Sequence, residues 1–145
     1  MWFDNGGFME QVVDKYAAEV GRVVRAQRAL RRGAFTVDDV VAEMTFGFWV
    51  HLLTSRYDDF LWQGGVFRSF PKVPAGMTRE DVYLRVDRLR NFRNKVAHHF
   101  AIFDQQPTAE YRNLLDLVEM VCVETGWLIR QLANPARVIG AKPRL

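Results

Sequence analysis

The chain has 145 residues, enough for one domain with its own hydrophobic core. Apolar residues make up 49% and charged residues 26%, which excludes intrinsic disorder over most of the length. The single cysteine excludes a disulfide framework, and the net charge of +3 permits an anionic partner without requiring one.

The sequence also lacks features of export and of membrane insertion. Residues 1–4 have neither the basic start nor the apolar segment of a signal peptide. The longest apolar run, residues 46–53 around His51, is too short to span a bilayer. Together with the lone cysteine, these features predict a cytoplasmic protein with no membrane partner.

Apolar residues at helical spacing predict a first helix from about Phe8 to Leu30. Its expected inward stripe is Val12, Tyr16, Val20, Val23 and Leu30. Gly33, preceded by two arginines, is typical of a helix end. This helix would occupy most of the first 35 residues.

Thr36 followed by Asp38 and Asp39 predicts the N-terminus of a second helix. Its expected stripe is Val37, Val41, Met44, Phe48 and Leu52. Gly47 lies inside this helix, where a glycine costs about 1 kcal/mol relative to alanine. The simplest explanation is the close approach of another helix or ring.

Residues 55–77 break the helical pattern, apart from a short helix at Tyr57–Trp62. A second capping signal at Thr78 and Asp81 then predicts a helix that ends near His99. The expected stripe of that helix is Val82, Val86, Leu89 and Val96. Residues 104–107 form a turn before the last helix.

The last helix is expected from about Thr108 to Leu132, with Cys122 as a small buried hydrophobe beside its stripe. That stripe is Leu114, Val118, Val121, Leu128 and Leu132. Pro135 ends the helix and begins a loose basic tail over residues 135–145. The sequence thus predicts an all-α protein, an antiparallel bundle of four to five helices in one domain over residues 1–134.

The positive charge of the chain is concentrated in one segment. Residues 79–100 hold six basic and three acidic residues, a balance of +3 that equals the net charge of the whole chain. A local basic face indicates polyanion binding better than the global sum does.

The densest polar cluster lies at the end of this basic helix. Asn94 and His98 are one turn apart on one face, and Arg90 precedes Asn94 on the same face. Arg93 is about 140° from His98 around an ideal helix, so it would reach that face by wrapping or from a second copy. A histidine exchanges protons near neutral pH and an arginine holds a phosphate in a bidentate fork. These are the groups that RNA cleavage by its own 2′-hydroxyl needs.

The cluster has two other interpretations, a solvated helix face, which is simpler than a catalytic site, and a metal site, which has less support. On spacing alone, a solvated basic helix face ending in a histidine cap explains the same residues. Metal binding is not expected, because adjacent His98 and His99 point about 100° apart and His51 is remote in sequence. We expect neither a metal nor another cofactor.

The segment Arg93–His98 resembles the R-x4–6-H motif of HEPN domains, with the frequent asparagine at Asn94. The wider stretch of residues 89–99 is similar to the Abi-like (abortive infection) branch of that superfamily. An upstream block, residues 45–53 with Tyr57, Leu61–Trp62 and Phe70–Pro71, also resembles that branch. The resemblance covers roughly residues 36–104.

The resemblance implies an all-α HEPN fold, a homodimer and a metal-independent endoribonuclease of a defence or toxin–antitoxin system. Arg93, His98 and Asn94 would be its catalytic residues. RNA-binding residues would be Arg88, Arg90, Lys95 and His99. The implied partners are RNA, a second copy, and a cognate antitoxin or defence-system partner.

The sequence departs from the family pattern after the motif. Relatives often follow the paired histidines with Glu-Pro, whereas Phe100 and Ala101 stand here. The alternative is therefore a non-catalytic HEPN module that binds RNA or a protein.

Overall fold

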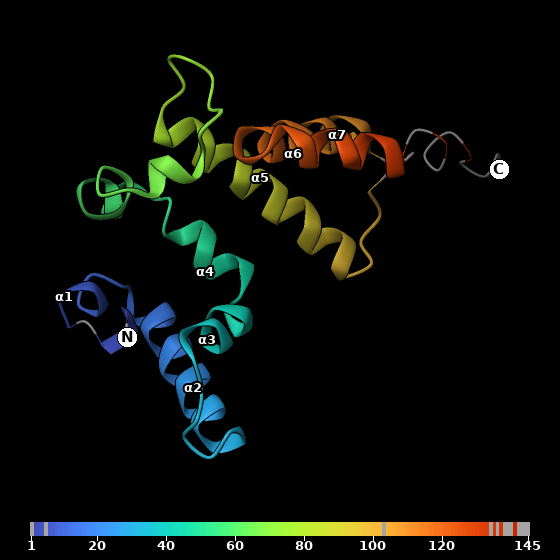
Figure 1. The fold of residues 1–145 in the computed structure, drawn as a ribbon. Coiled ribbons are helices and arrows are strands. Elements are labelled where there is room, and N and C mark those ends of the chain that lie inside the picture. The colour runs from blue at the N-terminus through green and yellow to red at the C-terminus, as the bar shows by residue number, and fades with distance from the viewer. Residues whose placement is uncertain are drawn as a thin grey trace. The chain divides into compact units, whose positions relative to one another are not determined.

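The chain is described by a computed structural model over residues 2–4, 6–102, 104–133, 135, 137 and 141. All regular secondary structure in these residues is helical, which confirms the all-α prediction (Figure 1). The helices gather into two compact units, Met1–Leu52 and Leu53–Leu145. The single domain over residues 1–134 stays a prediction, and most of the expected basic tail lies outside the described residues.

In the described part of the first unit there are four α-helices and one short 3-10 turn. They are η1 (Trp2–Asp4), α1 (Gly6–Met9), α2 (Asp14–Leu30), α3 (Val37–Glu43) and α4 (Phe46–His51). The expected helix from Phe8 to Leu30 is thus divided, and α2 begins only after Val13, which is extended. The expected start was wrong because Val12 keeps the apolar spacing while lying, buried, in the link before α2.

The core of the first unit joins α2 to α3 and α4. It consists of Val20, Val23, Val40, Met44 and Phe48. Leu30, expected to face inward, is 76% exposed at the end of α2. Val40 is buried and Val41 is exposed, so the buried face of α3 differs by one residue from the expected stripe.

The expected second helix is two helices with a break at Met44–Thr45. Thr36 and Asp39 form the expected capping box at the start of α3. The Thr45 hydroxyl then accepts a hydrogen bond from the Phe48 amide and begins α4. Gly47 follows directly, and a Cβ there would lie 3.4 Å from the hydroxyl oxygen of Tyr16. A side chain here would thus meet Tyr16 at ordinary van der Waals distance, so the close approach of a ring stays a prediction.

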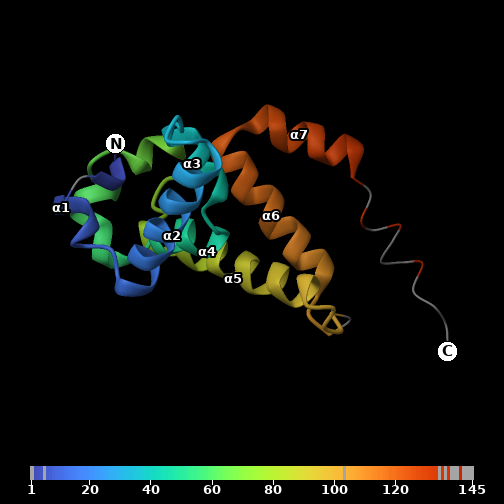
Figure 2. The ribbon, with the colours of Figure 1, turned by 90° about the horizontal axis from the view of Figure 1, so that it is seen from below.

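Within the described ranges up to residue 133, the second unit consists of short turns followed by three α-helices. Its elements are the 3-10 turn η2 (Ser55–Tyr57), the π-helical turn η3 (Asp58–Trp62), the 3-10 turn η4 (Val66–Ser69), and α5 (Arg79–Ala97), α6 (Pro107–Val121) and α7 (Val123–Leu132). Figure 2 shows α5, α6 and α7 in succession, with the chain reversing at each link. The predicted bounds of α5 are confirmed to within two residues.

Cys122 interrupts the expected last helix. Its backbone is extended, with φ −152° and ψ 112°, so α6 ends before it and α7 begins after it. The thiol is half-buried and lies 3.3 Å from Oε2 of Glu124, so the expected burial of Cys122 was wrong. The inward residues of α6 are Leu115, Leu117 and Met120 rather than the expected stripe, and Val121, Leu128 and Leu132 are exposed.

The start of α5 is fixed to the turns that precede it. Val82 is fully buried with Leu53 and Trp62, and the Arg79 guanidinium donates to the Leu53 carbonyl at 2.6 Å. Thr78 and Asp81 form the expected capping box. The second half of α5 has no buried residue among those described, so it presents its polar side chains to solvent.

The capping box makes the stability of the second unit pH-dependent. Hydrogen bonds from the side chain and backbone of Thr78 hold the pKa of Asp81 below its ordinary value of 3.8. Because the pKa is depressed on folding, this stabilisation is full above pH 4 and is lost as the pH falls through the folded-state value. We expect the urea midpoint of Asp81→Asn to approach that of the wild type between pH 6 and pH 3. Glu80→Gln, which lies outside the box, is the control, and a gap that does not narrow would contradict this account.

Candidate functional site

Most basic side chains of α5 are neutralised by carboxylates. Four of its six cations are in ion pairs. The pairs join Arg79 to Asp58 at 3.7 Å, Arg85 to Asp116 at 3.5 Å, Arg88 to Glu110 at 2.6 Å, and Arg90 to Asp87 at 2.7 Å. The +3 balance of the segment is therefore not spread evenly along the helix.

The remaining two cations, Arg93 and Lys95, lie near the end of α5. Arg93 donates to the Asn94 side-chain oxygen at 3.3 Å, and Lys95 donates to the amide oxygen of Gln105. Both partners are neutral, and within the described residues neither cation is in an ion pair. Both side chains are also exposed. The uncompensated positive charge of the helix thus lies in its last two turns.

Two histidines end the helix beside these cations. His98 is the C-cap residue, and its amide donates to the Asn94 carbonyl. His99 follows in the left-handed region with φ 57°. The Phe100 amide donates to the Lys95 carbonyl at 3.0 Å and the His99 amide to the Val96 carbonyl at 3.1 Å, which together form a Schellman motif. Both imidazoles are exposed at a helix end.

The left-handed conformation of His99 predicts an unusual stabilising substitution. Only glycine adopts this conformation without a steric cost, which for other residues is about 1–2 kcal/mol. We expect His99→Gly to raise the free energy of unfolding by about 1 kcal/mol in urea denaturation. His98→Gly is the matched control, because His98 has φ −96° and glycine there should destabilise. A loss of stability in both variants would contradict the prediction.

The structure brings some of the predicted catalytic residues together and leaves others apart. Arg93 contacts Asn94, and Asn94 is joined to His98 through the backbone. Arg93 and His98 share no hydrogen bond within the described residues, and their positions are about 140° apart on the helix. A single copy therefore places Asn94 between the arginine and the imidazole without pairing the two directly.

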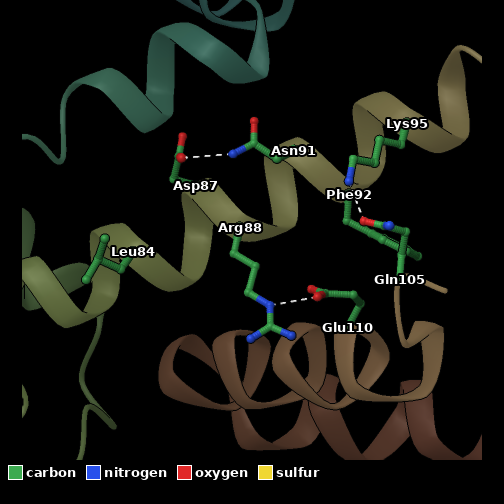
Figure 3. Close-up of a pocket in the computed structure, with 8 residues that line it drawn as sticks. All are labelled: Leu84, Asp87, Arg88, Asn91, Phe92, Lys95, Gln105 and Glu110. Atoms are coloured by element: carbon green, nitrogen blue, oxygen red, sulfur yellow. Dashed lines mark hydrogen bonds and ion pairs between the residues drawn. The ribbon is translucent and has the colours of Figure 1, made fainter. Parts of the chain in front are cut away.

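The predicted RNA-binding residues Arg88 and Lys95 line one cleft between α5 and α6 (Figure 3). The cleft has a volume of about 290 Å³. Its other lining residues are Leu84, Asp87, Asn91, Phe92, Gln105 and Glu110. Arg90 does not line this cleft and is held by Asp87 instead.

Sequence reasoning missed Glu110, the charged residue of this cleft that is most deeply buried. Its side chain is only 7% exposed and accepts from Nε of Arg88. Glu110 precedes buried Leu117 by seven residues, so the two share the inward face of α6. An acidic residue at the helical spacing of the buried apolar residues is the sequence pattern that indicates a buried carboxylate.

Neither a metal-binding cluster nor a membrane-spanning helix is present in the described residues. No three histidine, cysteine, aspartate or glutamate side chains there gather into a metal-binding group. Within the same residues, no helix has the length and apolar character needed to cross a membrane.

The fold and the site define an all-α protein with exposed cations and imidazoles at one helix end. Comparison with family models, with curated proteins and with solved structures finds no match for this chain. The HEPN assignment therefore stays a prediction that depends on the residues quoted above.

Proposed function

We propose that the protein is a metal-independent endoribonuclease of the HEPN type, with its site at the C-terminal end of α5. The observation that carries the proposal is the charge distribution of that helix. Four cations are neutralised by carboxylates, whereas Arg93 and Lys95 keep their charge next to two exposed imidazoles. This combination suits a substrate that carries phosphates and needs proton transfer.

The proposed reaction uses the nucleophile that RNA itself carries. His98 takes the proton of a 2′-hydroxyl, and the oxygen attacks the adjacent phosphorus. The bond from phosphorus to the 5′-oxygen breaks, and that oxygen takes up the proton that His98 has accepted. The products are a 2′,3′-cyclic phosphate and a 5′-hydroxyl. Arg93 stabilises the charge of the pentavalent phosphate, and Asn94 holds the Arg93 guanidinium in place.

A homodimer is part of this proposal, because Arg93 and His98 face different directions on one helix. A second copy would supply the missing partner at a shared site. Val96 and Phe100, which are 47% and 65% exposed beside the histidines, are apolar side chains that a second copy would cover. Light scattering is expected to give the mass of a dimer, and a monomer at all concentrations would contradict this part.

The biological setting follows from the resemblance alone. An endoribonuclease of a defence or toxin–antitoxin system would need an inhibitory antitoxin or another defence partner. The second candidate is a non-catalytic HEPN module that binds RNA or a protein. It is favoured by the absence of a direct bond between Arg93 and His98 within the described residues.

The decisive experiment is RNA cleavage in excess EDTA. Structured and unstructured RNAs are incubated with the purified protein, and the ends of the products are analysed. We expect cleavage that resists EDTA and leaves cyclic phosphates. RNA binding without any cleavage would favour the non-catalytic module. Neither binding nor cleavage of RNA would contradict the ribonuclease and leave only a module that binds a protein.

A further inference from the structure

The cleft between α5 and α6 contains a buried carboxylate oxygen without a partner. One oxygen of Glu110, Oε1, accepts a hydrogen bond from Nε of Arg88 at 2.6 Å. Its other oxygen, Oε2, is buried and has no hydrogen-bond donor within the described residues. A buried carboxylate oxygen in this condition is costly, because it has lost its hydrogen bonds to water and gained none in return. The oxygen therefore indicates a ligand that donates a hydrogen bond.

The surroundings of Glu110 restrict the chemistry of that ligand. Figure 3 shows the carboxylate and the Arg88 side chain meeting between the two helices, with the Phe92 ring and Lys95 nearby on α5. An aromatic ring suits stacking with a base, and the two cations suit a phosphate. At about 290 Å³ the cleft is at the small end of ligand sites, which range over about 300–1,000 Å³. One nucleotide fits these features better than a folded partner does.

Access to Glu110 depends on Arg88. The Arg88 side chain is 56% exposed, whereas that of Glu110 is 7% exposed. Arg88 can therefore turn outward to a phosphate and uncover the carboxylate. The edge of guanine that carries N1–H and the 2-amino group has the same arrangement of donors as a guanidinium. This edge would replace Arg88 on Oε1 and at the same time supply the missing donor to Oε2.

We propose that this cleft binds a guanine base of the RNA substrate, with Glu110 on the base edge and Arg88 and Lys95 on the phosphate. The proposal rests on the proposed function, since it assigns a base preference to the same ribonuclease. It places guanine two helical turns from His98, because Asn91 in the cleft and His98 are seven residues apart on one face of α5. Cleavage would thus occur near a guanosine.

The first test needs no variant. The wild-type protein is titrated with GMP, IMP, AMP, CMP and UMP by isothermal calorimetry. IMP differs from GMP only in lacking the 2-amino group. We expect GMP to bind about 10-fold more tightly than IMP, the effect of one hydrogen bond to a charged group. AMP, CMP and UMP, which lack the pair of adjacent donors, are expected to bind no more tightly than IMP. Equal binding of GMP and IMP, or no binding of either, would overturn the proposal.

The second test assigns the preference to Glu110. Glu110→Gln is expected to weaken GMP about 10-fold and to bring its affinity to that of IMP. Asp116→Asn is the matched control, because it removes the other ion pair between α5 and α6 without lining the cleft. It should keep the wild-type ratio of GMP to IMP. A wild-type ratio in Glu110→Gln would overturn the role of this residue.

These measurements separate the cleft from the catalytic proposal, because a nucleoside monophosphate binds without being cleaved. Guanine preference without RNA cleavage would leave the cleft as a binding site and contradict the ribonuclease. Cleavage by a protein that does not distinguish GMP from IMP would retain the ribonuclease and overturn the cleft.

Discussion

His98→Ala is expected to lower the rate of RNA cleavage by about 10²–10⁴-fold, the usual contribution of general acid–base catalysis. The reason is that His98 is the exposed imidazole one turn from Asn94 and next to the uncompensated charge of Arg93 and Lys95. Single-turnover cleavage in EDTA, followed by the appearance of cyclic-phosphate ends, measures the effect directly.

The control for this substitution is His51, which is remote from the proposed site in the sequence. His51 stacks on Tyr16 in the first unit, with ring centroids 4.6 Å apart. His51→Gln is expected to keep the cleavage rate of the wild type. Equal rates in the wild type and in His98→Ala would contradict the assignment, and so would an equal loss in both variants.

Arg93→Ala is expected to lower the cleavage rate by about 10²–10³-fold, the loss found when one donor to a developing charge is removed. Arg93 is suited to this role because its guanidinium donates only to a neutral amide within the described residues. Arg85→Ala on the same helix is the matched control, since Asp116 already neutralises Arg85. It should cleave at the wild-type rate.

Mixing the two inactive variants tests whether the site is shared between copies. A mixed dimer of Arg93→Ala and His98→Ala has one site with both residues intact, if each site takes Arg93 from one copy and His98 from the other. We expect the mixture to recover part of the wild-type rate. A mixture that stays inactive while forming dimers would place both residues of the site in one copy.

The two capping boxes and the long helix of the basic segment were predictable from the sequence because their determinants are local. Thr36 with Asp39 and Thr78 with Asp81 need only a hydroxyl and a carboxylate three residues apart. The end of α5 near His99 was also close to its predicted place. No glycine marks it, because His99 itself adopts the left-handed conformation.

The helix breaks were not predictable because they interrupt a continuous apolar pattern. Met44 is buried although α3 has already ended, so the stripe continues across the break into α4. Cys122 behaves similarly between α6 and α7, where no proline or glycine stands at the break. At the first break the Thr45 hydroxyl caps α4, but one threonine within an apolar pattern does not by itself predict a new helix.

The candidate site was predicted in part. Composition identified α5 as the basic helix, but charge counting could not show which cations have acidic partners. Asp58, Glu110 and Asp116 come from outside α5 and neutralise three of its arginines, and Asp87 within the helix neutralises a fourth. Such pairing depends on how the chain folds back, so only the structure restricts the free charge to the last turns.

The pairing on α5 has a consequence for how binding should respond to ionic strength. Counterions are released only by phosphates that cations newly neutralise, and the affinity for a single strand falls with a logarithmic slope of about −0.7 for each. If only Arg93 and Lys95 of α5 act in this way, one copy contributes a slope of about −1.4 and two copies about −2.8. Where Arg88 leaves Glu110 for a phosphate in the cleft, it adds about −0.7 for each copy. Six free cations would give about −4.2 for one copy. A shallow salt dependence would therefore distinguish this helix from an ordinary basic stripe that binds nucleic acid by charge alone.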